Sequence, residues 1–523
     1  MSLWWQSGVI YQIYPRSFAD ENGDGVGDLA GILSKLDYLS WLGVDAIWIS
    51  PIFPSPMADF GYDVSNYTDI DPLFGTLSDI DTLVRAAHER DLKVILDFVP
   101  NHTSSEHPWF KESRSSRENP KRDYYLWHDA KPDGSPPNNW LSVFGGSAWT
   151  WNEPTRQFYY HAFLAEQPDL NWRNPEVRSA IYDAMRFWLD RGVDGFRMDV
   201  LWHLLKDAEL RDNPKNPQYT PDQTPYNSLL PVYSTDQADV HEIVREMRAL
   251  VDSYRERVLI GEIYLPIHQL VTYYGANSDG AHLPFNFQLI TLPWNARKIA
   301  AAISEYEGAL PHDAWPNWVL GNHDRPRIAT RVGLAQAKVA AMLLLTLRGT
   351  PTLYYGDELG LLDAKIPPAE ARDPQGLNVG LSRDPQRAPM PWTAEPGAGF
   401  SRAKPWLPLA ADHARSNVET ERADPNSMLA LYRRLLELRR AEAALSVGHY
   451  VPLDCIGDLL AFRRETPEQA FLVVLNLGAR VGSFPLECSG RIVVAVEREK
   501  EGQAVNGTLA VSSNGGFVIE LDR

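Results

Sequence analysis

Cysteine is scarce in this chain of 523 residues, which has two of them, Cys455 and Cys488. Two thiols make no disulfide framework of the kind that small secreted proteins use, so a reducing compartment is expected, although one bridge between them stays open. The sequence also lacks any run of about 18 apolar residues, which a membrane helix would need. The N-terminal segment has neither the basic start nor the cleavage site of a signal peptide. These absences predict a cytoplasmic protein that does not enter a membrane.

Basic residues are outnumbered, since 50 Lys and Arg stand against 68 Asp and Glu and give a net charge of −18. An acidic surface disfavours nucleic acids and anionic membranes, so neither is expected as a partner. Aromatic residues are plentiful by contrast, with 17 Trp. Ring faces stack on the C–H faces of pyranoses, so this composition suits a sugar-binding protein, although Trp also packs ordinary cores.

Eight short apolar runs alternate with helix-like stretches along the chain. Strands that are apolar almost throughout and alternate with helices are typical of a parallel sheet covered on both faces. Eight such strands predict an α/β fold in which the sheet closes into a (β/α)8 TIM barrel. The runs cover residues 9–15, 46–51, 94–100, 195–200, 259–264, 283–288, 318–324 and 350–358.

Other segments depart from this alternation. Residues 103–170 are rich in Pro, Asn, Trp and Ser and too long for a βα loop, so we expect an inserted subdomain after the third strand. Irregular stretches at 203–240 and 360–425 follow the fourth and eighth strands, where loops cover the carboxyl end of a barrel.

The sequence pattern changes near the C-terminus, where short strands separated by Gly and Asn turns predict a separate antiparallel β domain. The expected units are a barrel at 1–102 and 171–440, an inserted subdomain at 103–170 and a C-terminal domain at 441–523.

Three acids stand at the ends of apolar runs, in the strings GFRMDV, GEIY and GNHD. In a barrel of this kind the carboxyl ends of the strands converge on one pocket, which would bring Asp199, Glu262 and Asp324 together. Two carboxyl groups suffice for glycoside hydrolysis with retention, one as nucleophile and one as acid/base. The third can bind sugar hydroxyls. The alternative is three unrelated surface acids.

Neighbouring residues support this interpretation. Arg197 lies two residues before Asp199 on a strand, so the two side chains point the same way, and the guanidinium would keep the carboxylate ionised. A purely structural ion pair remains open. Glu262 follows an apolar run, and an acid that protonates a leaving oxygen needs the raised pKa that burial and nearby carboxylates supply. His102 and His323 flank the acids and suit donors to sugar hydroxyls.

The string DENGDGVGD predicts a metal site after the first strand. Its oxygen ligands have the spacing of an EF-hand loop, with Gly25 at the turn. Gly31 stands where that loop would carry its bidentate Glu. We therefore expect a structural Ca²⁺ or Mg²⁺ and no organic cofactor, the alternative being a solvated turn. The expected ligands are Asp20, Asn22, Asp24, Asp28 and the carbonyl of Val26.

With these residues in place, the sequence resembles the α-amylase superfamily, glycoside hydrolase family 13, over nearly the whole chain. YQIYPRSFAD, DGVGDLAGI, GYDVSNY and QPDLNW resemble its oligo-1,6-glucosidase and α-glucosidase branch. The resemblance implies a TIM barrel with an inserted B subdomain and a C-terminal antiparallel β-sandwich. It implies Asp199 as nucleophile, Glu262 as general acid/base and Asp324 as transition-state stabiliser.

The resemblance also implies a subsite for the terminal glucose, lined by His102, Arg197 and His323. Tyr62 would stack on the sugar ring, and Asp59 would pair with Arg383 and grip the terminal O4. Such a pair closes the pocket behind the sugar and makes the enzyme exo-acting. Arg387, in the same motif, is the alternative to Arg383. In this branch the loop at 20–28 binds the metal.

The implied function is a retaining α-glucosidase acting on maltose, isomaltose, sucrose or related oligosaccharides, with α-1,4 or α-1,6 linkages and some transglucosylation. Val200, the residue after the nucleophile, favours α-1,6 bonds. The alternative is a sucrose isomerase, sucrose hydrolase or trehalose synthase, which would share the covalent intermediate. A non-catalytic transporter heavy chain would lack the full set of acids and carry a membrane helix. We expect a monomer or homodimer.

Overall fold

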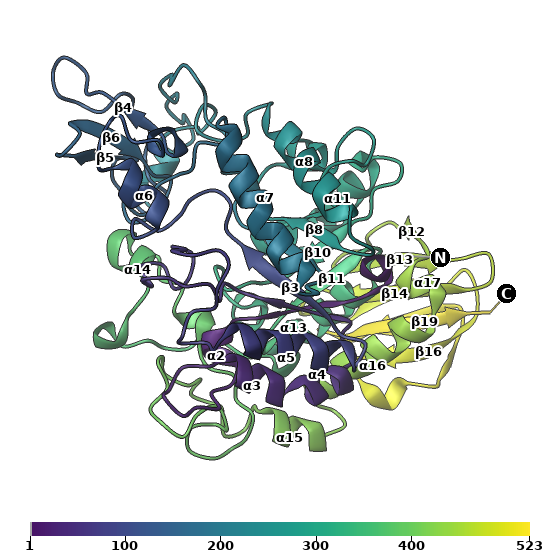
Figure 1. Cartoon of the computed structure of the whole chain (residues 1–523). Helices are drawn as coiled ribbons and strands as arrows, with labels where there is room; N and C mark the ends of the chain where they lie inside the picture. The colour runs from purple at the N-terminus through teal and green to yellow at the C-terminus, as the bar shows by residue number, and fades with distance from the viewer. Residues whose placement is uncertain (1–2, 523) are drawn as a thin grey trace.

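The computed structural model describes residues 3–522 and is built around eight parallel strands in a nearly closed barrel (Figure 1). Neighbours run in the order β10-β11-β1-β2-β3-β7-β8-β9. The fold class expected from the eight apolar runs is therefore confirmed. The strands are β1 (Ile10–Ile13), β2 (Ala46–Ile49), β3 (Lys93–Phe98), β7 (Gly195–Met198), β8 (Val258–Gly261), β9 (Leu283–Pro284), β10 (Asn317–Val319) and β11 (Thr350–Tyr354).

The gap in the strand order, between β9 and β10, is bridged by one side chain. The Asn317 amide oxygen accepts from the backbone N–H of Asn286 at 2.9 Å, and its nitrogen donates to the carbonyl of Pro284. Asn317 is fully buried. A buried amide that satisfies backbone groups on the facing strand takes the place of a ladder hydrogen bond, which explains a polar residue in an otherwise apolar run.

Helices pack around the barrel and bury apolar side chains against it. The helix before β7 shows why the sequence folds this way: Asn174 caps it by accepting from the N–H of Glu176 at 2.9 Å, and Pro175 is its first residue. The main helices are α3 (Leu29–Ser34), α4 (Leu36–Leu42), α5 (Leu77–His88), α7 (Pro175–Asp190), α8 (Val240–Asp252), α11 (Ala296–Ala309), α13 (Leu334–Thr346) and α16 (Met428–Ala441).

The segment between β3 and α7 forms a small unit beside the barrel mouth, in blue at the upper left of Figure 1. It holds α6 (Pro108–Ser113) and a three-stranded antiparallel sheet ordered β4-β6-β5. Its own core contains Trp140, Trp149, Phe158 and Tyr160. The strands are β4 (Trp127–His128), β5 (Trp149–Asn152) and β6 (Gln157–Tyr160).

The C-terminal part is antiparallel, as expected, with a six-stranded sheet ordered β12-β13-β14-β19-β16-β17 and a two-stranded sheet of β15 and β18. Its strands are β12 (His449–Pro452), β13 (Leu459–Glu465), β14 (Ala470–Asn476), β15 (Gly482–Pro485), β16 (Gly490–Ala495), β17 (Ala504–Val505), β18 (Thr508–Val511) and β19 (Gly516–Leu521).

Two buried arginines bind the carbonyls at the end of α13, and one of them, Arg464, comes from the C-terminal part. Arg439 on α16 donates to the carbonyls of Leu345 and Leu347 at 3.1 and 3.0 Å, and Arg464 on β13 donates to that of Thr346 at 2.6 Å. The last carbonyls of a helix have no partner within the helix and carry partial negative charge. Arg439 supplies such partners from within the barrel, and Arg464 supplies one across the junction with the C-terminal part.

Cys455 and Cys488 both carry free thiols, so the bridge left open by the sequence is not formed. Within residues 3–522, every helix is too short or too polar to span a bilayer.

Candidate active site

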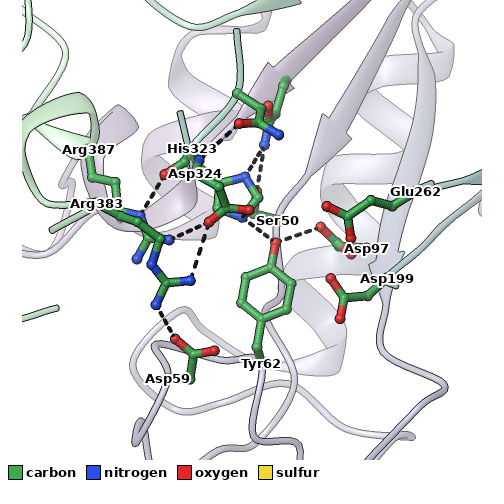
Figure 2. A network of polar contacts seen from close by, with 12 residues as sticks. Ser50, Asp59, Tyr62, Asp97, Asp199, Glu262, His323, Asp324, Arg383 and Arg387 are labelled. Carbon is green, nitrogen blue, oxygen red and sulfur yellow. Dashed lines mark hydrogen bonds and ion pairs between the residues drawn. The ribbon is translucent and has the colours of Figure 1, made fainter. Parts of the chain in front are cut away.

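The three acids do meet at the carboxyl ends of the barrel strands (Figure 2). Asp199 follows β7, Glu262 follows β8 and Asp324 follows β10. All three line one cavity of about 420 Å³. Because β7 and β8 are paired in parallel, their ends lie side by side and present Asp199 and Glu262 together.

One arginine organises the acids on this side of the cavity. The Nη1 atom of Arg197 lies 2.8 Å from both Asp97 Oδ1 and Asp199 Oδ1, and Nη2 lies 2.8 Å from Glu262 Oε2. Arg197 is fully buried and lies over the ring of Trp48. We call Asp97, Asp199 and Glu262 the acid cluster. A single guanidinium thus holds three carboxyl groups in fixed positions.

The pKa values within the acid cluster differ from the expectation for Asp199. Burial and the neighbouring Glu262 raise the pKa of Asp199 well above its usual range, against the pull of Arg197. Burial likewise raises the pKa of Asp97 to about 6. Asp199 was expected to stay ionised because of Arg197 alone. Desolvation and a second carboxylate outweigh the effect of that guanidinium on the pKa of Asp199. Asp97 and Asp199 contact the same guanidinium, so the protonation of one affects the other.

Val200 adds a strained backbone to this arrangement. It adopts φ 38° and ψ 48°, the left-handed region that β-branched residues avoid. The turn directs its N–H to Glu262 Oε2 at 3.0 Å and places Val200 on the cavity wall. Such strain costs about 1–3 kcal/mol and persists where the surroundings enforce it. The turn therefore orients Glu262 while fixing the residue beside Asp199.

Asp324 is held by cations on the opposite side of Tyr62 (Figure 2). Its Oδ1 atom accepts from Arg387 Nη2 at 2.9 Å and from Arg383 Nη1 at 3.3 Å. Burial opposes ionisation, but the Nε2–H group of His323, 3.3 Å from Asp324 Oδ2, and the two guanidinium groups outweigh it and hold the pKa of Asp324 well below its usual range. Asp324 is therefore a fixed negative charge, unlike Asp97 and Asp199, whose pKa values are raised.

Arg383 also closes one end of the cavity. Its Nη2 atom lies 2.6 Å from Asp59 Oδ1, and Asp373 braces it from the other side at 2.7 Å. Gln167 donates to the second oxygen of Asp59 at 3.2 Å. Of the two candidate arginines, Arg383 lines the cavity and contacts Asp59, whereas Arg387 binds Asp324 from behind the wall.

Tyr62 is fixed by a chain of hydrogen bonds. Gln12 Nε2 lies 2.8 Å from His323 Nδ1, His323 Nε2 lies 2.7 Å from the Tyr62 hydroxyl, and that hydroxyl donates to Asp97 Oδ2 at 3.0 Å. Because an amide nitrogen only donates, His323 Nδ1 accepts and Nε2 carries the hydrogen. Burial lowers the pKa of His323 to about 3, so the ring is neutral. The chain orients Tyr62, whose ring lines the cavity.

Some of the residues expected to contact the sugar lie on the cavity wall. Asp59, Tyr62, His102 and Arg383 line the cavity, and burial lowers the pKa of His102 to about 4. Arg197 and His323 are buried behind the wall instead, where each holds wall residues in place. They were expected to line the glucose subsite. Their position suits fixing the acids and Tyr62.

The wall includes residues that the sequence did not single out. Gln167 lies on the wall and within the QPDLNW string. Asp97 lies behind the wall and stands opposite Arg197 in the β3–β7 ladder, so strand pairing could have revealed it. The remaining wall residues come mostly from long insertions, which carry no periodic signal. They include Val143, Phe144, Phe163, Trp202, His203, Tyr226, Pro231, Tyr264, Arg325 and Leu381.

The loop at 20–28 shows oxygens of the predicted kind engaged with its own backbone. Asp20 accepts from the N–H groups of Gly23 and Gly25 at 2.6 and 2.8 Å, and Asp24 accepts from that of Val26 at 2.8 Å. In the part of the chain from 3 to 522, no three His, Cys, Asp or Glu side chains converge closely enough to hold a metal ion. The donor chemistry fits a hard cation, because Asp20 Oδ1, Asn22 Oδ1 and Asp24 Oδ1 each accept one hydrogen bond and keep a second lone pair.

Comparison with known proteins places this geometry in context. The model of the alpha-amylase catalytic domain matches residues 12–448. A probable alpha-glucosidase of Rhizobium meliloti (strain 1021) is 43% identical over 492 residues, which cover 91% of this chain and 89% of that protein. The solved structure of the alpha-glucosyl transfer enzyme XgtA has a TM-score of 0.94 and 42% identity, with 100% of both chains covered. A mutant of the trehalulose synthase MutB has a TM-score of 0.92 and 35% identity, covering 99% of this chain and 100% of that one.

Proposed function

This chain belongs to the alpha-amylase family and is a glycoside hydrolase, and we propose that it is an exo-acting retaining α-glucosidase that releases terminal non-reducing glucose from di- and oligosaccharides. The observation that carries the proposal is the buried ion pair of Asp59 and Arg383, braced by Asp373. A wall of this kind accepts the end of a sugar chain and gives a longer chain no way through. The similarity to a probable alpha-glucosidase supports the same conclusion.

In the proposed reaction, Glu262 protonates the glycosidic oxygen while a carboxylate oxygen of Asp199 attacks C1. The bond from C1 to the aglycone breaks, and a covalent glucosyl-Asp199 ester forms. Water then gives a proton to Glu262 and displaces Asp199 from C1. Two inversions give net retention. Arg197 holds both acids throughout, since it contacts each at 2.8 Å.

The remaining wall residues bind the glucose in this proposal. Asp324, kept ionised by its arginines, accepts from sugar hydroxyls and stabilises positive charge at C1. Tyr62 stacks on the ring, His102 donates to a hydroxyl, and the Asp59–Arg383 pair grips O4. Hydrogen bonds from charged groups are the strong ones, so these contacts fix the sugar for attack.

The type of glycosidic bond that the enzyme cleaves depends on the residue after the nucleophile in this proposal. Val200 lies on the cavity wall directly after Asp199. In related enzymes Val at this point accompanies α-1,6 preference and Thr accompanies α-1,4. We propose that the enzyme accepts α-1,6 bonds, alone or alongside α-1,4 bonds.

A glucosyl transferase or sucrose isomerase is the second candidate. The similarity to XgtA and to MutB favours it, since their names state glucosyl transfer and trehalulose synthesis. Both candidates share the covalent intermediate and differ only in what attacks it, water or a sugar hydroxyl.

A time course on maltose, isomaltose, sucrose and trehalose, each tested separately with products resolved by chromatography, distinguishes these functions. We expect rapid glucose release with the α-anomer appearing first, and isomaltose cleaved at least as well as maltose. New disaccharides without net glucose would replace the hydrolase by an isomerase. A β-anomer appearing first would contradict retention.

We also propose that Ca²⁺ or Mg²⁺ stabilises the loop formed by Asp20, Asn22, Asp24, Val26 and Asp28. Ion binding to the folded state alone stabilises it by about 2.7 kcal/mol at a hundredfold excess over Kd. Chelation by EDTA should therefore lower the Tm by a few degrees and leave the initial kcat unchanged.

The matched variant is Asp24→Ala, which removes a ligand whose side chain lies outside the catalytic cavity. It should show the lowered Tm without EDTA and no further change with it. Immediate loss of activity on chelation at unchanged Tm would disprove a structural role.

A further inference from the structure

A second cavity, lined by four arginines, lies apart from the catalytic one, and we infer that it binds the phosphate group of a small molecule. Its volume is about 280 Å³, and none of its lining residues lines the catalytic cavity. The inference is therefore independent of the proposed α-glucosidase function. Four arginines in one cavity stand out in a chain whose net charge is −18. They are Arg422, Arg433, Arg434 and Arg498, which we call the arginine cluster.

Three segments of the chain bring the arginine cluster together. The helix α15 (Val418–Ala423), at the lower edge of Figure 1, supplies the first arginine, and α16 supplies the next two. The short 3-10 helix η8 (Arg498–Lys500) of the C-terminal part supplies the last. Because α16 packs against both α15 and α4, the cavity lies where barrel helices meet the C-terminal part. A site assembled from three segments exists only in the folded chain.

Two of the guanidinium groups lie over one aromatic ring. Arg422 and Arg433 are 4.2 and 4.3 Å from the centroid of the Trp41 ring, which comes from α4. The ring attracts both cations and holds them near each other. It supplies no counter-charge, so Trp41 positions two positive groups without neutralising them.

The other two guanidinium groups converge on one carbonyl oxygen. Nη1 of Arg434 and Nη1 of Arg498 donate to the carbonyl of Pro425 at 3.3 and 3.2 Å. Burial, and after it the neighbouring Arg498, lowers the pKa of Arg434 against the opposing effect of Glu501. A neutral carbonyl offsets little of the repulsion between two like charges, whereas an anion bound between them would offset it.

Acidic side chains pair with only half of the arginine cluster. Glu437 lies 2.8 Å from Arg433, and Glu501 lies 3.1 Å from Arg434. Among the residues that the structure describes, the arginines on α15 and η8 have no ion-pair partner. These two guanidinium groups are therefore available to an anionic ligand.

The remaining acids of the cavity wall bind backbone groups instead. Glu421 accepts the N–H of Leu429 at 3.1 Å, and burial raises the pKa of Glu421 to about 7. Asp424 accepts the N–H of Asn426 at 2.9 Å. Glu421 is thus only partly ionised at neutral pH, and positive charge prevails in the cavity.

A phosphate group matches what the arginine cluster offers. Guanidinium groups donate two parallel hydrogen bonds to phosphate oxygens, and such charge-assisted bonds are strong. The volume of 280 Å³ is at the lower end of ligand sites, which begin at about 300 Å³. This size favours inorganic phosphate or a hexose phosphate over a nucleotide. The net charge of −18 disfavours a long polyanion such as a nucleic acid.

The test measures the Tm of the whole protein against increasing concentrations of inorganic phosphate or glucose 6-phosphate, with NaCl keeping the ionic strength constant. A ligand that binds the folded state alone raises the Tm by a few degrees at a large excess over Kd. We expect this rise with both compounds, and the fitted Kd values identify the source of the phosphate group. A lower Kd for glucose 6-phosphate would identify an ester, and equal values would identify inorganic phosphate.

Variants then identify the site. Arg422→Gln and Arg498→Gln each remove a cation without leaving a carboxylate unpaired, and each should weaken phosphate binding by on the order of tenfold or more. Activity on maltose should not change, because both residues lie outside the catalytic cavity. Arg491→Gln is the matched control, because Arg491 is an exposed arginine of the C-terminal part that lies outside this cavity. It should bind phosphate as the wild type does.

Phosphate also stabilises proteins without binding them, because it is excluded from their surface. An equal rise in Tm in the wild type and in both variants would therefore overturn the inference and leave the glucosidase function untouched. Tighter binding of a single-stranded oligonucleotide than of either phosphate compound would overturn it in favour of a nucleic-acid surface.

Discussion

Replacing Asp199 with Asn is expected to lower kcat/KM for maltose on the order of a thousandfold or more while raising the Tm. Activity falls because the amide oxygen is a poor nucleophile toward C1. Stability rises because folding raises the pKa of Asp199 well above its usual range, so at pH 7 its negative charge opposes folding. A neutral Asn removes that cost. Arg197 keeps Asp97 and Glu262 as partners, so no buried cation is left unpaired.

The sign of the stability effect follows from linkage. A carboxyl group whose pKa is raised by folding binds its proton more tightly in the folded than in the unfolded state. Its favourable contribution is complete below the unfolded pKa of about 4 and is lost as pH rises through the folded value. The gain in Tm from Asp199→Asn should therefore be seen at pH 7 and vanish near pH 4.

Asp97→Asn is the matched control for this prediction. Asp97 contacts the same guanidinium at the same 2.8 Å but is 1% exposed and lies behind the cavity wall. Its loss should cost activity less than a hundredfold, through the positions of Tyr62 and Arg197. Azide should rescue Asp199→Ala on an activated donor and yield β-glucosyl azide, because it occupies the space of the lost carboxylate. Near-wild-type activity in Asp199→Asn, or equal rescue of Asp97→Ala, would remove Asp199 from its role.

The convergence of the three acids was predictable because each follows the carboxyl end of an apolar strand. Parallel strands in a barrel share one carboxyl edge, so Asp199, Glu262 and Asp324 had to converge once the strands were recognised. The expected pairing of Asp59 with Arg383 came from the family resemblance and matches a distance of 2.6 Å. These features depend on local sequence and on a known order of strands.

Other features depend on tertiary contacts that no local pattern encodes. The surrounding structure holds Val200 in a left-handed conformation that a β-branched residue normally avoids, so the backbone preference of Val predicts the wrong conformation here. The raised pKa of Asp199 follows from burial beside Glu262, a residue far along the chain. Much of the cavity wall comes from three insertions whose irregular sequences carry no period, so only the structure shows which of their side chains line the cavity.

Glu262→Gln is expected to lower kcat/KM for maltose by a factor of about 10²–10⁴, the usual range for general acid catalysis. The same variant should retain far more activity on α-glucosyl fluoride, whose leaving group needs no proton. Gln preserves the shape of the side chain and can still accept the N–H of Val200, which lies 3.0 Å from Glu262 Oε2. It has no proton to give to the glycosidic oxygen.

The pH profile provides a second, independent readout of the same variant. The acid limb of kcat/KM should persist, because it reports the acid cluster, in which burial raises the pKa of Asp97 to about 6 and that of Asp199 well above its usual range. Activity should therefore fall with acidification at a higher pH than an ordinary Asp, near 4, would give. The alkaline limb should flatten, because no catalytic proton remains to be lost. An equal loss on maltose and on the fluoride, with both limbs intact, would mean that Glu262 only positions the substrate and that another group donates the proton.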